Sequence, residues 1–250
     1  MLLGASNLTL AFPLVVARLR VALPAPLEIL AAIGHGRSYG RTSRMLAREL
    51  PGITECGLWR ALDRTQDPGT NGATCALLTD FGNDIVYGAE VDTIAGWIET
   101  ALERLARHGA RCALVRMPLR TLERVSPLRF WVARGILYPS HPIAFARVRE
   151  RARALDARIV ELARAHGAAL VEQREEWYGV DPVHIRRRRR DAAWAEILAP
   201  LETGRAQPAR GLERAALGSL LPERRRFLGR DEVHAQPAVE LLDGTTISVY

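Results

Sequence analysis

Short apolar runs alternate with longer amphipathic segments over the first 199 residues, and this alternation constrains the fold more than any other feature of the sequence. Residues 91–107, for example, carry apolar side chains at helical spacing and lie between the short apolar runs 75–79 and 112–115. Short strands that alternate with helices of this length form a parallel sheet that is covered by helices on both faces. We therefore expect an α/β fold, a three-layer doubly wound parallel sheet.

The pattern predicts each element over a definite range. Strands are expected at 2–3, 27–33, 75–79, 112–115 and 168–171, and helices at 8–20, 41–50, 91–107, 145–165 and 191–198. Residues 200–211 are rich in proline and glycine, which is typical of a linker. We divide the chain into a domain at 1–199 and a linker with a C-terminal extension at 200–250.

The extension contains two apolar runs, 238–242 and 245–250, on either side of the pair Asp243-Gly244. Asp-Gly is typical of the tight two-residue turn of a β-hairpin. Because an isolated hairpin is only marginally stable in water, it needs a surface to pack against. We expect the hairpin to dock either on the core of the domain or on a second subunit, in which case the protein is a homo-oligomer.

The charge of the chain raises the question of an acidic partner. The formal net charge is +7 and the sequence pI is about 10.1. Every basic side chain is an arginine, as a GC-rich genome tends to encode, and the arginines are spread over several helices and are not gathered with aromatic residues. This distribution argues against a nucleic-acid partner. The run Arg186–Arg190 has two interpretations, a solvated face of the last helix or recognition of an anionic substrate or surface.

The cysteines and the first helix bear on location. The three cysteines have no metal-site spacing, and two of them lie in apolar runs, which favours a reducing compartment. The apolar segment 8–23 is interrupted by Arg18 and Arg20 and contains Pro13, so we interpret it neither as a secretion signal nor as a transmembrane segment. We expect a cytoplasmic protein.

Four polar motifs directly follow predicted strands, at the edge where such sheets bind ligands. Ser6 follows the first strand and begins a helix, where the helix dipole favours negative charge beside a hydroxyl, although an N-cap role is common for serine. The glycine-rich segment 34–40 follows the second strand and could leave an amide free to face the cleft. Asn83, after the third strand, could donate its side-chain amide to an oxyanion or serve as a turn residue.

The fourth motif is Asp181-Pro182-Val183-His184, after the last strand of the domain. A spacing of three residues lets the Asp181 carboxylate reach the His184 imidazole, fix its tautomer and support its positive charge during proton transfer. In order and spacing, the four motifs resemble the four sequence blocks of the SGNH (GDSL-type) hydrolase family. The resemblance covers about residues 1–199.

The resemblance implies a flavodoxin-like α/β fold and a serine esterase without a cofactor. Ser6 would be the nucleophile that forms an acyl-enzyme with a small-molecule ester, and Asp181 and His184 would be the acid and base of the triad. Gly36 and Asn83 would supply the oxyanion hole, with Gly40 as the alternative to Gly36. The sequence departs from the family at one position, because Ala5 replaces the aspartate of Gly-Asp-Ser, a carboxylate that normally braces the site.

Several alternatives stay open from the sequence. An acyltransferase could use the same residues, and the loss of the carboxylate at position 5 would also suit a weakly active or inactive descendant. The segment Gly36–Gly40 matches the Gly-x-Ser-x-Gly nucleophile elbow, with Ser38 as nucleophile, but too few strands precede it for an α/β-hydrolase. The aromatic-containing segment 128–141 could line an acyl pocket or form a satellite core. The sequence does not select the substrate.

Overall fold

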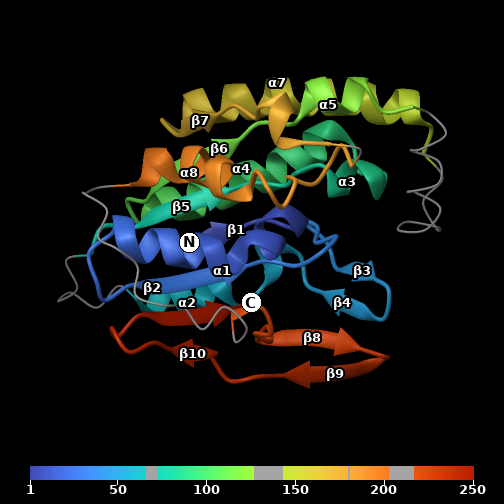
Figure 1. Cartoon of the computed structure of the whole chain (residues 1–250). Coiled ribbons are helices and arrows are strands. Elements are labelled where there is room, and N and C mark those ends of the chain that lie inside the picture. Colours follow the sequence, from blue (N-terminus) through green and yellow to red (C-terminus); the bar gives the residue numbers. More distant parts are fainter. Residues whose placement is uncertain (66–71, 127–142, 180, 203–216) are drawn as a thin grey trace.

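The computed structural model describes residues 1–65, 72–126, 143–179, 181–202 and 217–250, and they form a seven-stranded sheet between two layers of helices (Figure 1). The order of the strands in this sheet is β10-β11-β2-β1-β5-β6-β7. Their bounds are Leu2–Leu3 (β1), Glu28–Ala32 (β2), Cys75–Leu78 (β5), Arg111–Val115 (β6), Ala169–Val171 (β7), Val239–Glu240 (β10) and Thr246–Val249 (β11). All neighbours are parallel except β10, which is antiparallel to β11. The five strands from β2 to β7 have the flavodoxin-like order 2-1-3-4-5, so the predicted fold class is confirmed.

Helices cover both faces of the sheet. One face carries α1 (Ser6–Ala22) and α8 (Arg190–Leu198), and the other carries α2 (Leu58–Arg64), α4 (Val91–Arg107) and α7 (Phe145–Ala165). The shorter helices are α3 (Asn83–Val86), α5 (Leu119–Glu123), η1 (Ile53–Glu55), η2 (Glu175–Trp177) and η3 (Ala199–Leu201). Successive side chains along a strand point to opposite faces of the sheet, so Leu2 packs in the core with α1 and Leu3 packs in the core with α4.

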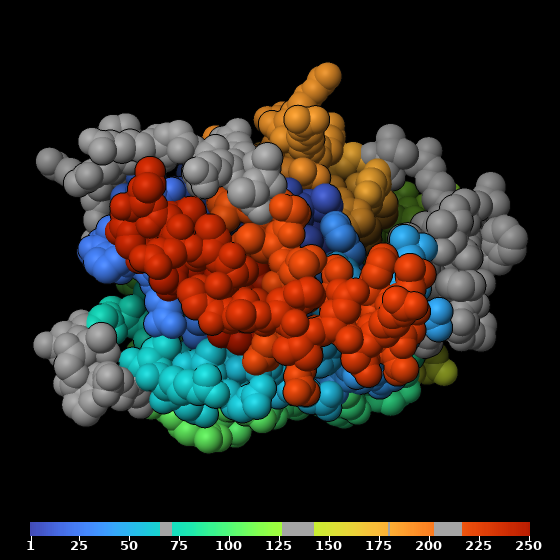
Figure 2. Space-filling model, turned by 90° about the horizontal axis from the view of Figure 1, so that it is seen from below, coloured from blue at the N-terminus to red at the C-terminus, as the bar shows by residue number. Residues whose placement is uncertain are grey.

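The C-terminal hairpin docks on the core of its own chain. β11 extends the sheet beside β2, and its register runs from Thr246 opposite Glu28 to Val249 opposite Ala31. Figure 2 shows the C-terminal segment, in orange to red, covering much of one face of the molecule. Most of the predicted linker lies outside the described residues, so the division between residues 199 and 200 stays a prediction, as does a homo-oligomer.

The helix expected at 41–50 is wrong, because this segment forms a β-hairpin. A second, four-stranded antiparallel sheet contains β3 (Ser43–Met45), β4 (Arg48–Leu50), β8 (Arg224–Phe227) and β9 (Arg230–Val233), in this order. The pairing that decides the structure joins Arg48 to Phe227, from the other end of the chain. Tertiary strand pairing of this kind overrides a weak local preference for helix.

The sheet topology selects one edge for a ligand site. Strand order reverses at β1, whose neighbours β2 and β5 follow it in the chain, and such a switch point leaves a crevice outside the carboxyl ends of the strands. Three of the four motifs begin at the ends of these three strands. Within the described part of the chain, each helix is too short or too polar to span a bilayer.

Candidate active site

Ser6 lies directly after β1 and occupies the first position of α1. Its side chain is half-buried and makes no hydrogen bond within the described residues. The first amides of a helix have no partner inside the helix and carry the positive end of its dipole. A negative charge beside the Ser6 hydroxyl would therefore be stabilised.

A carboxylate from another strand caps the start of α1. Ala5, which precedes the helix, offers no side-chain cap. Asp80, which follows β5, accepts hydrogen bonds on Oδ2 from the amides of Ala5 (3.0 Å) and Leu8 (3.2 Å). Its Oδ1 accepts a third from the side chain of Asn7 at 3.0 Å. A carboxylate thus lies at the helix start that carries Ser6, although position 5 carries none.

Asn7 holds the segment around His184 against the start of α1. Its side-chain nitrogen donates to the carbonyl oxygen of Val183 (2.8 Å), and its side-chain oxygen accepts from the amide of Ile185 (2.9 Å). Val183 and Ile185 are the two neighbours of His184, and Asn7 is the neighbour of Ser6. The residue after Ser6 is therefore bonded to both neighbours of His184, although no hydrogen bond joins the Ser6 and His184 side chains among the described residues.

His184 and Asp181 form a hydrogen-bonded pair. The Nδ1 atom of His184 lies 2.7 Å from Asp181 Oδ2, and Asp181 Oδ1 accepts from the amides of Val183 (3.0 Å) and His184 (3.2 Å). Partial burial works to raise the pKa of Asp181, but hydrogen bonds from the His184 ring and the Val183 amide together hold it below its usual value. With Nδ1 engaged, Nε2 is the ring nitrogen available to act as a base.

Gly36 presents an amide without a hydrogen-bond partner within the described residues. Its φ of 66° lies in the left-handed region that glycine adopts without strain. Met45 packs against its Cα, so a side chain at this position would clash, and the hydroxyl of Tyr87 donates to its carbonyl oxygen at 2.6 Å. Gly36 is thus held by Met45 and Tyr87 while its own N–H makes no hydrogen bond within the described residues.

Gly40, the alternative donor, is engaged elsewhere. Its amide donates to Ser38 Oγ at 3.3 Å, and its Cα packs against the ring of Trp97, where a Cβ would clash. Its role in this structure is close packing of a loop on α4. Of the two glycines, Gly36 is the one whose amide could meet an oxyanion.

The peptide group that carries the Gly36 amide is held from its other side by Arg48. The Arg48 Nη2 atom donates to the carbonyl oxygen of His35 at 3.2 Å. His35 is half-buried, and its pKa is lowered by burial and by the nearby charges of Arg48 and His184. A cation on the carbonyl polarises the peptide and makes its N–H a better donor.

Asn83 begins α3 and donates its side-chain amide to the carbonyl oxygen of Arg37, the residue after Gly36, at 3.3 Å. Asn83 and Gly36 therefore lie close to one another. Ser38 is fully buried and donates to Asp84, which also accepts from the amide of Tyr39 at 2.8 Å. Burial raises the pKa of Asp84 to about 6, against these hydrogen bonds.

The nucleophile-elbow alternative for Ser38 is wrong. An elbow needs a strand before the serine, a helix after it and an exposed hydroxyl. Here β2 precedes the loop, but β3 follows it, and the Ser38 hydroxyl has no exposed surface.

Two other sequence expectations concern surfaces near the site. Residues Arg186–Arg189 lie in an exposed turn before α8, so most of the arginine run is solvated outside the helix. The aromatic segment 128–141 lies outside the described residues. Sequence reasoning missed Asn7, Asp80 and Arg48 as parts of the site, because each acts through a partner far away in the chain or across a hairpin.

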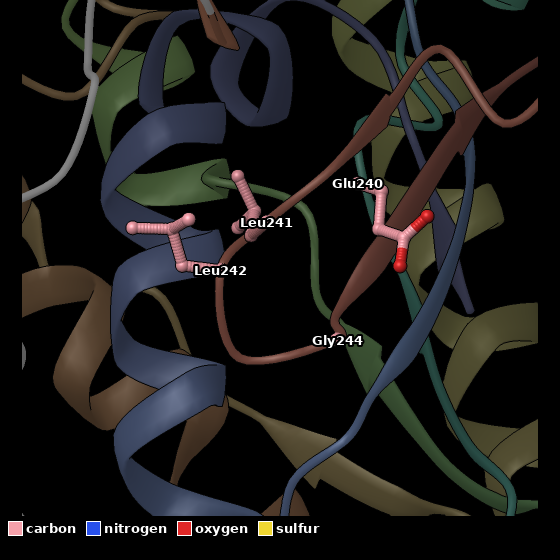
Figure 3. A pocket seen from close by; sticks show the side chains of 4 residues that line it. All are labelled: Glu240, Leu241, Leu242 and Gly244. Atoms are coloured by element: carbon pink, nitrogen blue, oxygen red, sulfur yellow. The ribbon is translucent and has the colours of Figure 1, made fainter.

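A hollow lined by Glu240, Leu241, Leu242 and Gly244 lies at the turn of the C-terminal hairpin (Figure 3). It is at the amino end of β11, the opposite edge of the sheet from Ser6. Its lining contains a single ionisable side chain and no nucleophile, so it has no chemistry to match the first site. Within the described residues, no group of three His, Cys, Asp or Glu side chains could hold a metal ion.

Comparisons with known proteins found similar solved structures. No family model matches the chain, and no curated protein sequence does. One similar structure is the psychrotrophic esterase EstA from Pseudoalteromonas sp., inhibited by monoethylphosphonate, with 13% identity, 80% of this chain and 94% of that chain covered, and a TM-score of 0.47. Another is a carbohydrate acetylesterase family member from Sinorhizobium meliloti, with 16% identity, 68% and 78% covered, and a TM-score of 0.44.

Proposed function

We propose that this protein is a serine ester hydrolase of the SGNH type that acts through an acyl-enzyme on Ser6. The observation that carries the proposal is the contact of Asn7 with both neighbours of His184. It supports the proposal because it joins the segment that carries Asp181 and His184 to the helix start that carries Ser6, and a serine, a histidine and an aspartate are the groups that acyl transfer to a hydroxyl uses.

The reaction would proceed in two halves. The Nε2 atom of His184 takes the hydroxyl proton as Ser6 Oγ attacks the ester carbonyl, and Asp181 stabilises the imidazolium. His184 then gives this proton to the leaving alkoxide, which departs as the alcohol. A water molecule, activated by the same imidazole, attacks the acyl-enzyme and releases the carboxylic acid and free Ser6.

The oxyanion of each tetrahedral intermediate would be held by the amides of Ser6 and Gly36 and by the side chain of Asn83. Donors of this kind are effective when they are fixed before the reaction. Contacts from Met45 and Tyr87 hold Gly36, which supports this role. Asn83 would exchange the Arg37 carbonyl for the oxyanion.

A fluorophosphonate probe tests the proposal, because it phosphonylates an activated serine irreversibly. Mapping the modified residue should identify Ser6, and Ser6→Ala should lower kcat for p-nitrophenyl acetate by roughly 10⁴-fold. Ser38→Ala is the matched control and should leave labelling at position 6. Labelling of another serine, or an unchanged rate in Ser6→Ala, would reject the assignment.

The choice of acceptor can be measured in the same assay. Added short-chain alcohols should give mainly the free acid if water is the acceptor, whereas a transesterified product would favour acyltransfer by the same residues. A small-molecule substrate and a cytoplasmic location both stay predictions.

A further inference from the structure

Exposed apolar side chains gather on the four-stranded sheet. Eight large hydrophobic residues are exposed among the described ones, and four of them belong to this sheet and its turns: Leu46, Phe227, Leu228 and Val233. Three of them, Leu46, Phe227 and Leu228, lie at its projecting end, formed by residues 45–48 and 227–230, which we call the paired turns. The amide of Leu228 donates to the carbonyl oxygen of Ala47 at 2.9 Å, so the two turns lie side by side (Figure 1).

The leucines of the paired turns are unfavourable for folding in two ways. Leu46 has φ 56° and Leu228 has φ 50°, so both adopt the left-handed conformation that suits glycine or asparagine in such turns. Their side chains are 79% and 71% exposed, respectively. A strained, exposed leucine at both turns gains nothing from packing within the chain, which points to a function outside it.

The charge around the paired turns is positive. Residues 43–50 and 224–233 contain six arginines and three carboxylates. The three carboxylates pair with Arg44 (3.9 Å), Arg225 (2.6 Å) and Arg226 (3.7 Å). No acidic partner in the described residues remains for the other three, which are Arg48, Arg224 and Arg230. Register places Arg48 and Arg230 on either side of Phe227, next to the turns.

The paired turns also adjoin the candidate active site. Met45, in the same rung as Arg48, packs against Gly36, and Arg48 donates to His35. A surface or molecule that binds Leu46 and Leu228 would therefore lie close to the end of the sheet that carries Ser6.

We propose that the paired turns dock on an anionic lipid surface, with Leu46 and Leu228 inserted among the acyl chains and the exposed unpaired arginines, Arg224 and Arg230, against the headgroups. Apolar side chains flanked by arginine at a projecting tip fit such an interface, where burial and charge act together. The second half of the inference rests on the proposed function: the ester substrate is one held at that surface.

A second copy of the chain fits the same surface less well. A two-fold contact through the paired turns would put the unpaired arginines of one copy against those of the other. Repulsion between like charges opposes that contact, whereas an anionic surface neutralises it.

Vesicle flotation tests the inference with the full-length protein. We would compare vesicles of phosphatidylcholine with vesicles that also contain phosphatidylglycerol, and expect binding to the anionic ones that weakens at high salt. The double variant Leu46→Asn/Leu228→Asn should reduce the bound fraction at least about tenfold, since two leucines leave the apolar phase. Asparagine suits the left-handed turns, so this variant should fold at least as well as the parent.

Leu242→Asn is the matched control, because it removes an even more exposed leucine from a hairpin turn at the opposite edge of the seven-stranded sheet. It should bind as the parent does. Equal binding by the double variant, or no binding by the parent, would overturn the inference. A parent that binds no vesicles but dimerises through Leu46 and Leu228 would replace it with self-association.

Activity separates this inference from the proposed function. The double variant should hydrolyse dissolved p-nitrophenyl acetate at the parent rate but lose the acceleration on a long-chain ester in anionic vesicles. If the protein binds vesicles but shows no hydrolysis that depends on Ser6, the docking surface would be supported and the proposed esterase activity would be rejected.

Discussion

At the scale of single residues, Asp80 supplies the carboxylate at the start of α1 that position 5 lacks. The chain has no carboxylate next to Ser6 in sequence, but Asp80 accepts three hydrogen bonds from the start of α1. A carboxylate at a helix N-terminus accepts hydrogen bonds from the unpaired amides and interacts favourably with the positive end of the helix dipole. The alanine at position 5 therefore does not by itself indicate an inactive protein.

The role of Asp80 can be measured by removing its charge. Asp80→Asn keeps the size of the side chain but weakens the bonds to Ala5 and Leu8, so we expect the protein to lose about 1 kcal/mol of stability. Small displacement of Ser6 should lower kcat by about 10–100-fold, with KM little changed. Asp92→Asn, on the exposed surface of α4, is the control. Parent-like kcat in Asp80→Asn would mean that the carboxylate is not part of the site.

Arg48 is the second residue whose contact predicts an effect on catalysis. It donates to the carbonyl of the peptide whose N–H would meet the oxyanion. Arg48→Met should lower kcat by less than the roughly 10²–10³-fold expected for loss of an oxyanion donor itself, and Arg48→Lys should recover part of it. Arg44→Met, on the opposite face of the same hairpin, should leave kcat unchanged. An equal loss in both variants would point to the fold of the hairpin and not to the peptide.

The raised pKa of Asp84 predicts that the stability of the protein depends on pH. Its pKa in the folded protein is raised to about 6 by burial. An unfolded aspartate titrates near about 3.9, so between these values the folded state holds a proton that the unfolded state has released. The contribution of Asp84 to stability is therefore lost as pH rises through this window, by up to about 1.4 kcal/mol per pH unit.

Urea unfolding of the parent and of Asp84→Asn at several pH values isolates this contribution. The difference in unfolding free energy between the two should fall from about pH 4 to about pH 6 and be constant at higher pH. A difference that does not vary with pH would show that Asp84 titrates normally.

At the scale of elements, periodicity and strand-end position predicted most of the structure. The helical pattern gave 91–107 and 145–165 with the bounds that α4 and α7 have. The hairpin at 43–50 could not be predicted in this way, because β4 finds its partner β8 from the far end of the chain. The contacts of Asn7 depend in the same way on residues more than 170 positions away.

The glycine-rich loop shows how two similar residues in one element differ in role. Gly36→Ala places a side chain in a left-handed position against Met45, so we expect a large loss of kcat together with a loss of stability. Gly40→Ala overpacks the contact with Trp97, which typically costs about 1–3 kcal/mol. Variants with equal stability loss should therefore differ in kcat, and thermal unfolding measured beside kinetics would show it. Equal losses of kcat at equal stability would remove the distinction between the two amides.

At the scale of the whole molecule, the C-terminal extension is joined to both the sheet and the site. β11 pairs with β2, and Arg37, next to Gly36, donates to the carbonyl oxygen of Tyr250. Ile247 has no exposed surface in the core beneath α1. A chain that ended at residue 199 would leave the edge of β2 unpaired and part of this core uncovered.

Ile247→Ala tests whether the extension belongs to one cooperative unit with residues 1–199. Truncating a fully buried isoleucine typically costs about 2–5 kcal/mol, and one core predicts that the whole protein unfolds earlier in a single transition. Leu242→Ala, in the same hairpin but fully exposed, should leave the midpoint unchanged. Two separate transitions, with only the first shifted by Ile247→Ala, would instead mean that the extension is an independent unit laid against a domain that is stable without it. β11 pairs with β2, and the glycine-rich segment 34–40 follows β2 directly. If the protein unfolds in a single transition, we therefore expect Ile247→Ala to lose its esterase activity at the same lower temperature at which it unfolds.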